Sequence, residues 1–424
     1  MGRIVKSRIG LLIVGAALTV ALVALATRSV VRWRNLRAVD RMVAAHQIPR
    51  AVDFVTSHFR LDRPDGWRAL RHLSIAVLRQ GLDDRDPYDR CYAATSLVDY
   101  GDWTGRRVID ASSNAKDLFQ QKAVVEGLAE ARDARAVELL RKFYTTGDRR
   151  LKSWTIEALA ENGNHRALPL LLEATTSSNQ GIKIWGIWGL GRLHDRRVVS
   201  YLRALQVKET DPLILAAIAH TLLALGDRTI GSIELIEAVF YDPNPDRASD
   251  AALELGDAAD SLAVPQLKAA LMNTELDLTI RLAAAVALTH YGNRDGLRLL
   301  QTVAADPYTN GELAPLLLNL NFNISRSLLI SAMSSHNVVL QLAATEAIGR
   351  LGGRTEIGIL TAALDKTSES FMTAQIAWSL GRLARPECIP PLVALLKSSN
   401  PTVRNSAADG LVRTTNRLLT GSNQ

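Results

Sequence analysis

Two helical patterns of apolar residues alternate along most of this chain. In the first, apolar side chains stand three residues apart, as at Val199, Leu202 and Leu205, and so share one face of a helix of about three turns. In the second, a leucine-like residue stands at a fixed place, as at Leu128 and Leu190, directly after a small residue. The alternation predicts pairs of closely packed helices and few strands.

The positions that end each second helix recur with a near-constant spacing. Aligned on the residue after the helix end, the intervals lie between 30 and 36 residues over most of the chain. Glycine precedes Asp or Asn at several of these junctions, as at Gly101-Asp102, Gly163-Asn164 and Gly256-Asp257. Glycine readily adopts the left-handed conformation that closes a helix, and the Asp or Asn side chain can cap the next one. The spacing therefore predicts a repeat array.

The sequence predicts an all-α protein, an α-solenoid of about ten to eleven two-helix repeats with a period of about 31 residues. Pro315 stands inside one predicted second helix (Glu312 to Leu320), where it removes a hydrogen bond and kinks the chain. We divide the chain into a basic tail (1–8), a transmembrane anchor (9–27), a basic juxtamembrane helix and linker (28–65), the solenoid (66–416) and a C-terminal tail (417–424).

The predicted anchor rests on one uncharged apolar run. Residues Ile9 to Ala26 contain no charge, and at about 1.5 Å per residue a helix of this length matches the hydrocarbon core of a bilayer. Cleavage after Ala26, which would give a periplasmic or secreted protein, is the alternative. We favour an uncleaved single-pass protein of the inner membrane, with a slight lean towards a cytoplasmic body from the positive-inside rule.

The residues after this run are predicted to touch the membrane surface. The helical pattern continues without a breaker and carries several arginines and one tryptophan, which suits contact with lipid headgroups. The predicted interface residues are Arg28, Arg32, Trp33, Arg34 and Arg37.

The formal charge of +7 belongs to the N-terminal segment. Up to Arg41 the chain holds eight basic residues and one acidic residue, and the remainder holds 42 of each kind. The neutral body lacks the excess of positive charge that duplex binding draws on, so we expect no nucleic acid partner.

The two cysteines are predicted to be free thiols. Cys91 and Cys388 lie almost three hundred residues apart, and in an extended array their Cα atoms could not come within the roughly 7 Å that a disulfide needs. Free thiols favour a reducing compartment.

The sequence contains no constellation that predicts catalysis, a metal site or a cofactor. The eight histidines are scattered without an i, i+4 pair, and neither cysteine has a partner nearby. Gly186, Gly189 and Gly191 imitate a phosphate-binding loop, but no strand precedes them. We interpret them as positions of close packing and helix termination.

A predicted binding groove follows from the helical register. Residues two and five positions before the fixed leucine point away from it, and in the first five repeats they include several aromatic and acidic side chains. If second helices line the concave surface, these form a groove suited to a basic or amphipathic peptide. Packing of the rings between adjacent repeats is the commoner fate of such positions, and both readings stay open. The groove residues are Tyr92, Glu126, Trp154, Glu157, Trp185, Trp188 and His220.

The repeats resemble a known family. The last unit, ECIPPLVALLKSSNPTVRNSAADGLVRT, has Asn400-Pro401, Val403-Arg404 and Ala407-Ala408 where phycobilisome-lyase-like HEAT repeats of the short bacterial type have Asp-Pro, Val-Arg and Ala-Ala. The resemblance implies a HEAT-repeat solenoid. It says little about function, because the family includes scaffolds, adaptors, chromophore lyases and DNA glycosylases.

Together these observations predict a membrane-tethered scaffold or adaptor that binds a protein partner through its concave face. The chain is not expected to be an enzyme. The alternative, which the resemblance alone supports, is a bilin-lyase-like or other enzyme built on the same fold.

Overall fold

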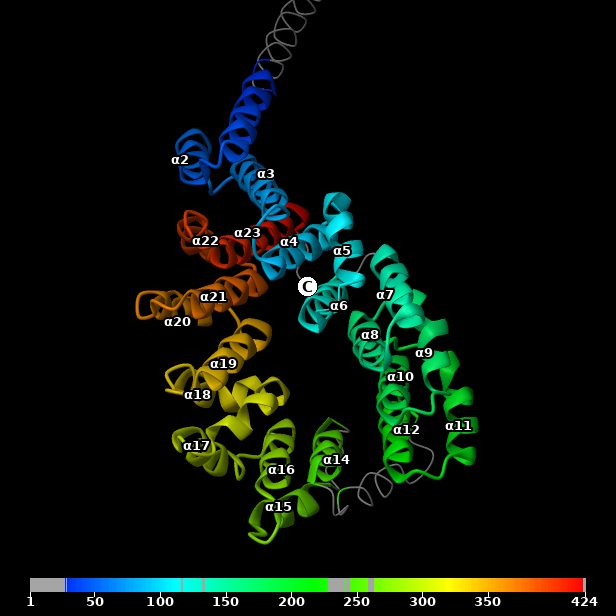
Figure 1. Cartoon of the computed structure of the whole chain (residues 1–424). Helices are drawn as coiled ribbons and strands as arrows, with labels where there is room; N and C mark the ends of the chain where they lie inside the picture. The colour runs from blue at the N-terminus through cyan, green and yellow to red at the C-terminus, as the bar shows by residue number, and fades with distance from the viewer. Residues whose placement is uncertain are drawn as a thin grey trace, which may run out of the picture.

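Helices account for the architecture of this protein (Figure 1). The computed structural model describes residues 27, 29–115, 117–131, 134–227, 240, 245–257 and 263–421. None of these residues forms a strand, so the prediction of an all-α protein is confirmed over this part of the chain. The predicted division into tails, anchor and linker stays a prediction.

The helices are arranged in successive pairs around a ring, and the second helix of each pair lines its inside (Figure 1). The outer helices are α5 (Arg106–Ser113), α7 (Ala134–Thr146), α9 (Leu168–Ala174), α11 (Val199–Lys208), α15 (Val264–Met272), α17 (Leu297–Ala305), α18 (Phe322–Ala332), α20 (Glu356–Leu364) and α22 (Ile389–Leu395). The inner helices are α4 (Pro87–Asp99), α6 (Leu118–Glu130), α8 (Arg149–Asn162), α10 (Gln180–Arg192), α12 (Pro212–Ala224), α14 (Pro245–Asp257), α16 (Leu278–His290), α19 (Val338–Leu351), α21 (Ser370–Leu383) and α23 (Pro401–Thr420).

The junction chemistry predicted from the sequence is present at most junctions. Gly101 and Gly163 have φ values of 75° and 64°, in the left-handed region, and the following Asp102 and Asn164 side chains accept backbone N–H groups of short 3-10 turns. Gly256 is an exception, because it lies within α14, where an added Cβ would meet Ala287 of α16. That glycine serves close helix packing instead of helix termination.

The fixed leucine-like positions form the centre of the core. Each of them, from Leu97 to Leu411, is at most 1% exposed. The small residues beside them allow close packing, as Gly189 of α10 does against Ala160 of the preceding repeat and Leu171 of its own outer helix, α9. Fully burying one such leucine contributes about 1.5–3 kcal/mol, so this column supplies much of the stability of the array.

The inner layer departs from regular α-helix at Pro315, as the sequence predicts. The segment that should form the second helix of its pair is a 3-10 helix, η5 (Asn310–Asn319), with Pro315 inside it. A 3-10 helix is tighter and rises further per residue than an α-helix, so this inner element differs in shape from its neighbours.

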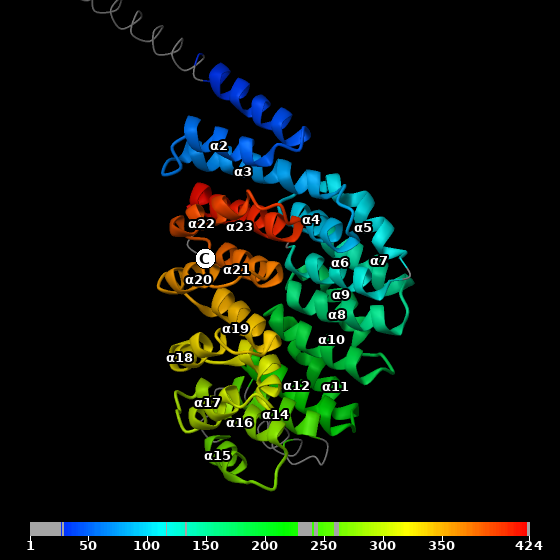
Figure 2. The same cartoon turned by 60° about the vertical axis from the view of Figure 1, so that its left-hand side comes forward.

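The solenoid closes on itself, which the sequence reading did not foresee. Helix α23 packs against α21 on one side and against α3 (Pro64–Gly81) and α4 on the other (Figures 1 and 2). Arg71 of α3 donates to Asn416 at 2.6 Å. Both cysteines are free, as predicted, and both are buried, but the reason given for the absence of a disulfide, an extended array, was wrong.

The predicted location in a membrane is not supported by the structure. No helix in the described part of the chain combines the length and apolarity needed to traverse a bilayer. Apart from Thr27, the predicted span lies outside the described residues. Arg28 lies outside them too. The described structure does not support the prediction of a single-pass inner-membrane protein, which is withdrawn together with the predicted membrane contact.

Two of the arginines assigned to a membrane interface, Arg32 and Arg37, have contacts within the protein. Residues 29–44 are helical, and α2 (Ile48–His58) follows. Arg32 pairs with Asp65 of α3 at 3.2 Å, and the Arg37 guanidinium lies 4.9 Å from the centre of the Trp33 ring.

Candidate functional site

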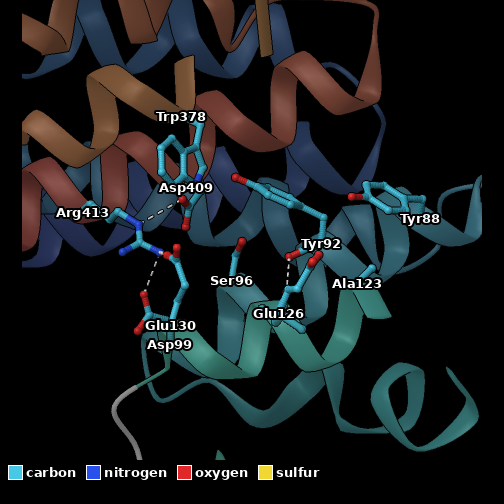
Figure 3. Close-up of a pocket in the computed structure, with 12 residues that line it drawn as sticks. Tyr88, Tyr92, Ser96, Asp99, Ala123, Glu126, Glu130, Trp378, Asp409 and Arg413 are labelled. Carbon is cyan, nitrogen blue, oxygen red and sulfur yellow. Dashed lines mark hydrogen bonds and ion pairs between the residues drawn. The ribbon is translucent and has the colours of Figure 1, made fainter. Parts of the chain in front are cut away.

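A pocket opens on the inner face where the two ends of the solenoid meet (Figure 3). It has a volume of about 190 Å³ and lies between α4 and α6 of the first repeats and α21 and α23 of the last ones. We call it the seam pocket. Its lining residues are Tyr88, Tyr92, Thr95, Ser96, Asp99, Ala123, Glu126, Gly127, Glu130, Trp378, Asp409 and Arg413.

Helix α4 supplies most of the aromatic wall. Asp86 caps it by accepting the Tyr88 backbone N–H, and Pro87 begins its first turn. Tyr88, Tyr92 and Thr95 then follow at spacings of four and three residues, which places them on one face of the helix. In Figure 3 the Tyr92 ring lies between Tyr88 and Trp378, and Arg413 lies at the far end of the pocket from Tyr88.

Arg413 of α23 holds the floor of the seam pocket together. Its guanidinium lies 3.0 Å from Asp99, 3.1 Å from Glu130 and 3.1 Å from Asp409. Tyr100 donates its hydroxyl to Asp409 at 2.5 Å. Residues from opposite ends of the chain therefore form one charged network, which joins the first two repeats to the last.

Two further arginines complete this network from the C-terminal side. Arg382 donates to Glu130 at 2.9 Å, and Arg350 lies 3.7 Å from Glu130 and 2.9 Å from Glu346. Both guanidinium groups lie against Trp378, at 5.4 Å for Arg350 and 5.3 Å for Arg382 from the ring centre. Cation–π contacts of this kind stabilise by roughly 0.5–2 kcal/mol, depending on desolvation.

Burial controls the pKa values in the network. It raises the pKa of Asp99 to about 6, against the opposing charge of Arg413. Burial and the negative charge of Asp409 raise the pKa of Tyr92 well above its usual value, with a smaller opposing contribution from the nearby Ser406. Burial acts to lower the pKa of Arg413, but its surrounding anions outweigh this and hold it charged.

Three exposed aromatic side chains stand beside the pocket. Tyr88, Phe119 and Phe371 are 48%, 78% and 64% exposed. Each stands nine residues before a buried leucine of its inner helix, which places it on the opposite face of that helix, near its start. Helices α21, α23, α4 and α6 are neighbours in this order, so the three side chains form an arc. We call this arc the aromatic rim.

Part of the groove predicted from the sequence coincides with the seam pocket. Tyr92 and Glu126 both line it, and Glu126 pairs with Lys122 at 3.2 Å. Trp154 is half-buried and packs against the core. Glu157 is half-buried, and burial, followed by the charge of Glu161, raises its pKa.

The remaining groove residues gather farther along the ring. Trp185 and Trp188 meet edge to face with ring centres 5.1 Å apart. Trp188 donates its indole N–H to the buried carboxylate of Glu254 at 3.2 Å, a contact that spans from α10 to α14. His220 is half-buried, and burial lowers its pKa. The structure thus brings together Trp185 with Trp188 and Tyr92 with Glu126, and the groove itself stays a prediction.

The sequence reading missed the charged network, although a signal for it exists. Two residues after the fixed leucine, the first three repeats have Asp99, Glu130 and Glu161, and the last three have Arg350, Arg382 and Arg413. Acidic residues at one end of an array and basic residues at the same register of the other end are complementary. This column would have predicted contact between the two ends.

Comparison with known proteins gives matches to helical repeats. The chain matches the family model described as HEAT repeats over residues 75–160 and 113–186, and the model of the PBS lyase HEAT-like repeat over residues 374–398. No curated protein matches. These matches support the prediction of HEAT repeats, and the phycobilisome-lyase type is matched near the C-terminal end, over residues 374–398.

Solved structures that resemble the chain are distant. Human deoxyhypusine hydroxylase in complex with glycerol is 16% identical, with 83% of this chain and 99% of that chain covered and a TM-score of 0.30. An engineered protein is 18% identical, with 80% and 98% covered and a TM-score of 0.25. The family matches, together with the ring of helix pairs, support a HEAT-repeat protein.

Proposed function

We propose that this protein is a HEAT-repeat scaffold that binds a protein partner at the seam, with the aromatic rim as the anchoring surface. The observation that carries the proposal is the position of Tyr88, Phe119 and Phe371, exposed on the inner helices α4, α6 and α21 that line a pocket. Aromatic side chains dominate the energetics of protein interfaces, and a large exposed apolar group that serves no internal packing favours a binding role.

The charges around the seam pocket favour a partner with a basic or amphipathic segment. Glu126 stands at the pocket with its side chain 58% exposed, and its ion pair with Lys122 is a surface pair within one helix. Such pairs contribute little, so a basic group of a partner can replace Lys122 at low cost. An extended peptide on the inner face would contact the rim and this carboxylate together.

Selection from a displayed library of random twelve-residue peptides tests the proposal. We expect enrichment of peptides that combine aromatic or aliphatic residues with Arg or Lys. Binding of the enriched peptides should weaken roughly tenfold or more in Phe119→Ala and in Phe371→Ala, as is usual for an anchoring aromatic residue.

Tyr308→Ala is the matched control, because Tyr308 is 95% exposed but lies between α17 and η5, away from the rim. It should bind the same peptides as the unaltered protein. Equal binding by all three variants would exclude the rim as the docking surface, and failure to enrich any peptide would count against the scaffold proposal.

A further inference from the structure

The seam pocket has the size of a receptor for one side chain. Its volume of about 190 Å³ leaves no room for a helix or a strand. Tyr88, Tyr92 and Trp378 form its apolar walls. On the opposite side, the small residues Ala123 and Gly127 of α6 leave space for a ligand. A long, unbranched side chain that enters from the inner face fits such a slot.

The lining of the pocket holds more carboxylates than cations, although Lys122 and Arg382, outside the lining, also pair with Glu126 and Glu130. Four carboxylates line it, from Asp99, Glu126, Glu130 and Asp409, whereas Arg413 is the one cation in the lining. Arg413 contacts three of these carboxylates but not Glu126. Glu126 is therefore the carboxylate that remains open to a ligand from the inner face.

A buried hydroxyl supplies a second, independent indication of a ligand. The Tyr92 Oη atom is buried; the Ser406 hydroxyl of α23 lies near it, but none of the described residues bonds to it with hydrogen-bond geometry. A buried polar group without a partner costs free energy, which a ligand that brings a donor recovers. Guanidinium and ammonium groups are such donors, and they also bind favourably against aromatic rings.

We propose that the seam pocket binds the guanidinium or ammonium group of one Arg or Lys side chain of the protein partner. The inference rests on the proposed scaffold function and specifies its ligand. The charged group pairs with Glu126 and donates to Tyr92 Oη, and the aliphatic stem packs against the Tyr88 ring. An anion would be repelled by the carboxylates of the lining. An apolar group would displace water from them without replacing the lost hydrogen bonds.

Titration with three small probes tests this proposal on the full-length protein. The probes are Nα-acetylarginine amide, Nα-acetyllysine amide and the uncharged Nα-acetylnorleucine amide. Labelling with 5-fluorotryptophan gives one fluorine signal per tryptophan, and the Trp378 signal is assigned by its loss in Trp378→Phe. We expect saturable shifts of this signal with the two basic probes and no shift with the norleucine probe.

Two variants locate the binding groups. Glu126→Gln should weaken arginine binding roughly tenfold, equivalent to about 1.4 kcal/mol. Glu138→Gln is the matched control, since Glu138 of the outer helix α7 is a carboxylate of similar exposure in a similar surface ion pair, with Arg141, and should bind normally. Tyr92→Phe retains the ring and removes only the hydroxyl, so a severalfold loss with an unchanged melting temperature would identify the hydroxyl as a ligand.

The outcomes separate this inference from the proposed function. Equal affinity for the norleucine probe, or no effect of Glu126→Gln, overturns the cation site. If selected peptides still bind the rim in that case, the scaffold proposal stands without it. If the free basic probes bind at the pocket but no peptide binds the rim, the site takes a small organic cation and both the scaffold proposal and its protein ligand fail.

Discussion

The seam and the middle of the ring differ in how their buried charged groups are compensated by partners. At the seam, Arg413 is surrounded by three carboxylates at 3.0–3.1 Å, and each side of the closure contributes to the network. In the middle, Glu254 of α14 is 5% exposed, and Trp188 is the one described residue that donates a hydrogen bond to its side chain. Its second oxygen, Oε2, is buried and has no partner among the described residues.

The difference shows in the pKa values. Anions around Arg413 keep that side chain charged, whereas burial and then the charge of Asp250 raise the pKa of Glu254 to about 8. Buried ionised groups persist when partners compensate their desolvation, and a group without compensation becomes neutral instead. The closure of the ring therefore rests on ionic pairing, and the contact between α10 and α14 rests on a carboxylic acid.

The largest expected effect comes from removing the seam cation. Arg413→Leu leaves the buried Asp409 and the half-buried Asp99 and Glu130 without their shared partner. Breaking a buried ion pair by removing one member costs about 3–5 kcal/mol. We expect a loss of this size in urea-induced unfolding and an increase of the radius of gyration in small-angle scattering as the ring opens.

Arg192→Leu is the matched control for the seam. Arg192 stands at the same register of its inner helix, two residues after Leu190, and is exposed. Surface changes of this kind stay within about 0.5 kcal/mol. A loss as large for Arg192→Leu as for Arg413→Leu would contradict the assignment of the closure energy to the charged network.

The second largest effect is a pH dependence of the free energy of unfolding, caused by Glu254 in the middle of the ring. The pKa of Glu254 lies at about 8 in the folded protein and near 4.5 in the unfolded chain. The folded state therefore holds the extra proton between these values, and stability falls as the pH rises through this window. From pH 6 to pH 8 the loss is about 2 kcal/mol.

Glu254→Gln removes the titrating group and should flatten this slope. Thermal or urea unfolding of both proteins between pH 5 and pH 9 measures it, and the variant should gain relative stability towards pH 9. Parallel pH profiles for the two proteins would show that Glu254 is ionised in the folded state and that the comparison of the two regions fails.

Local features of this fold follow from the sequence, but its closure does not. Helix ends at Gly101 and Gly163, the buried leucines and the irregular helix at Pro315 depend on neighbours within one or two repeats. Ring closure depends on the curvature of every repeat in between, because small rotations per repeat accumulate along a solenoid. Residues about three hundred positions apart in the chain, such as Tyr100 and Asp409, therefore meet without a local signal.

The candidate site, likewise, could be predicted from the sequence only where it depends on local helix register. Tyr92 and Glu126 were identifiable because their own helices point them to the inner face. Trp378 and Asp409 occupy the same register in late repeats, but only closure places them in the pocket with Tyr92. The charge pattern two residues after the fixed leucine was the one accessible long-range signal.

The smallest effect concerns Trp188, whose indole N–H ties α10 to Glu254. Trp188→Phe keeps an aromatic ring beside Trp185 and removes the donor. A hydrogen bond to a neutral group contributes about 1 kcal/mol and one to a charged group about 1.5–3 kcal/mol. The cost of the substitution should therefore rise from about 1 kcal/mol at pH 5 to about 2 kcal/mol at pH 9. Trp185→Phe, with no such bond to lose, should show a cost that does not change with pH, and identical profiles for the two variants would mean that Trp188 contributes packing alone.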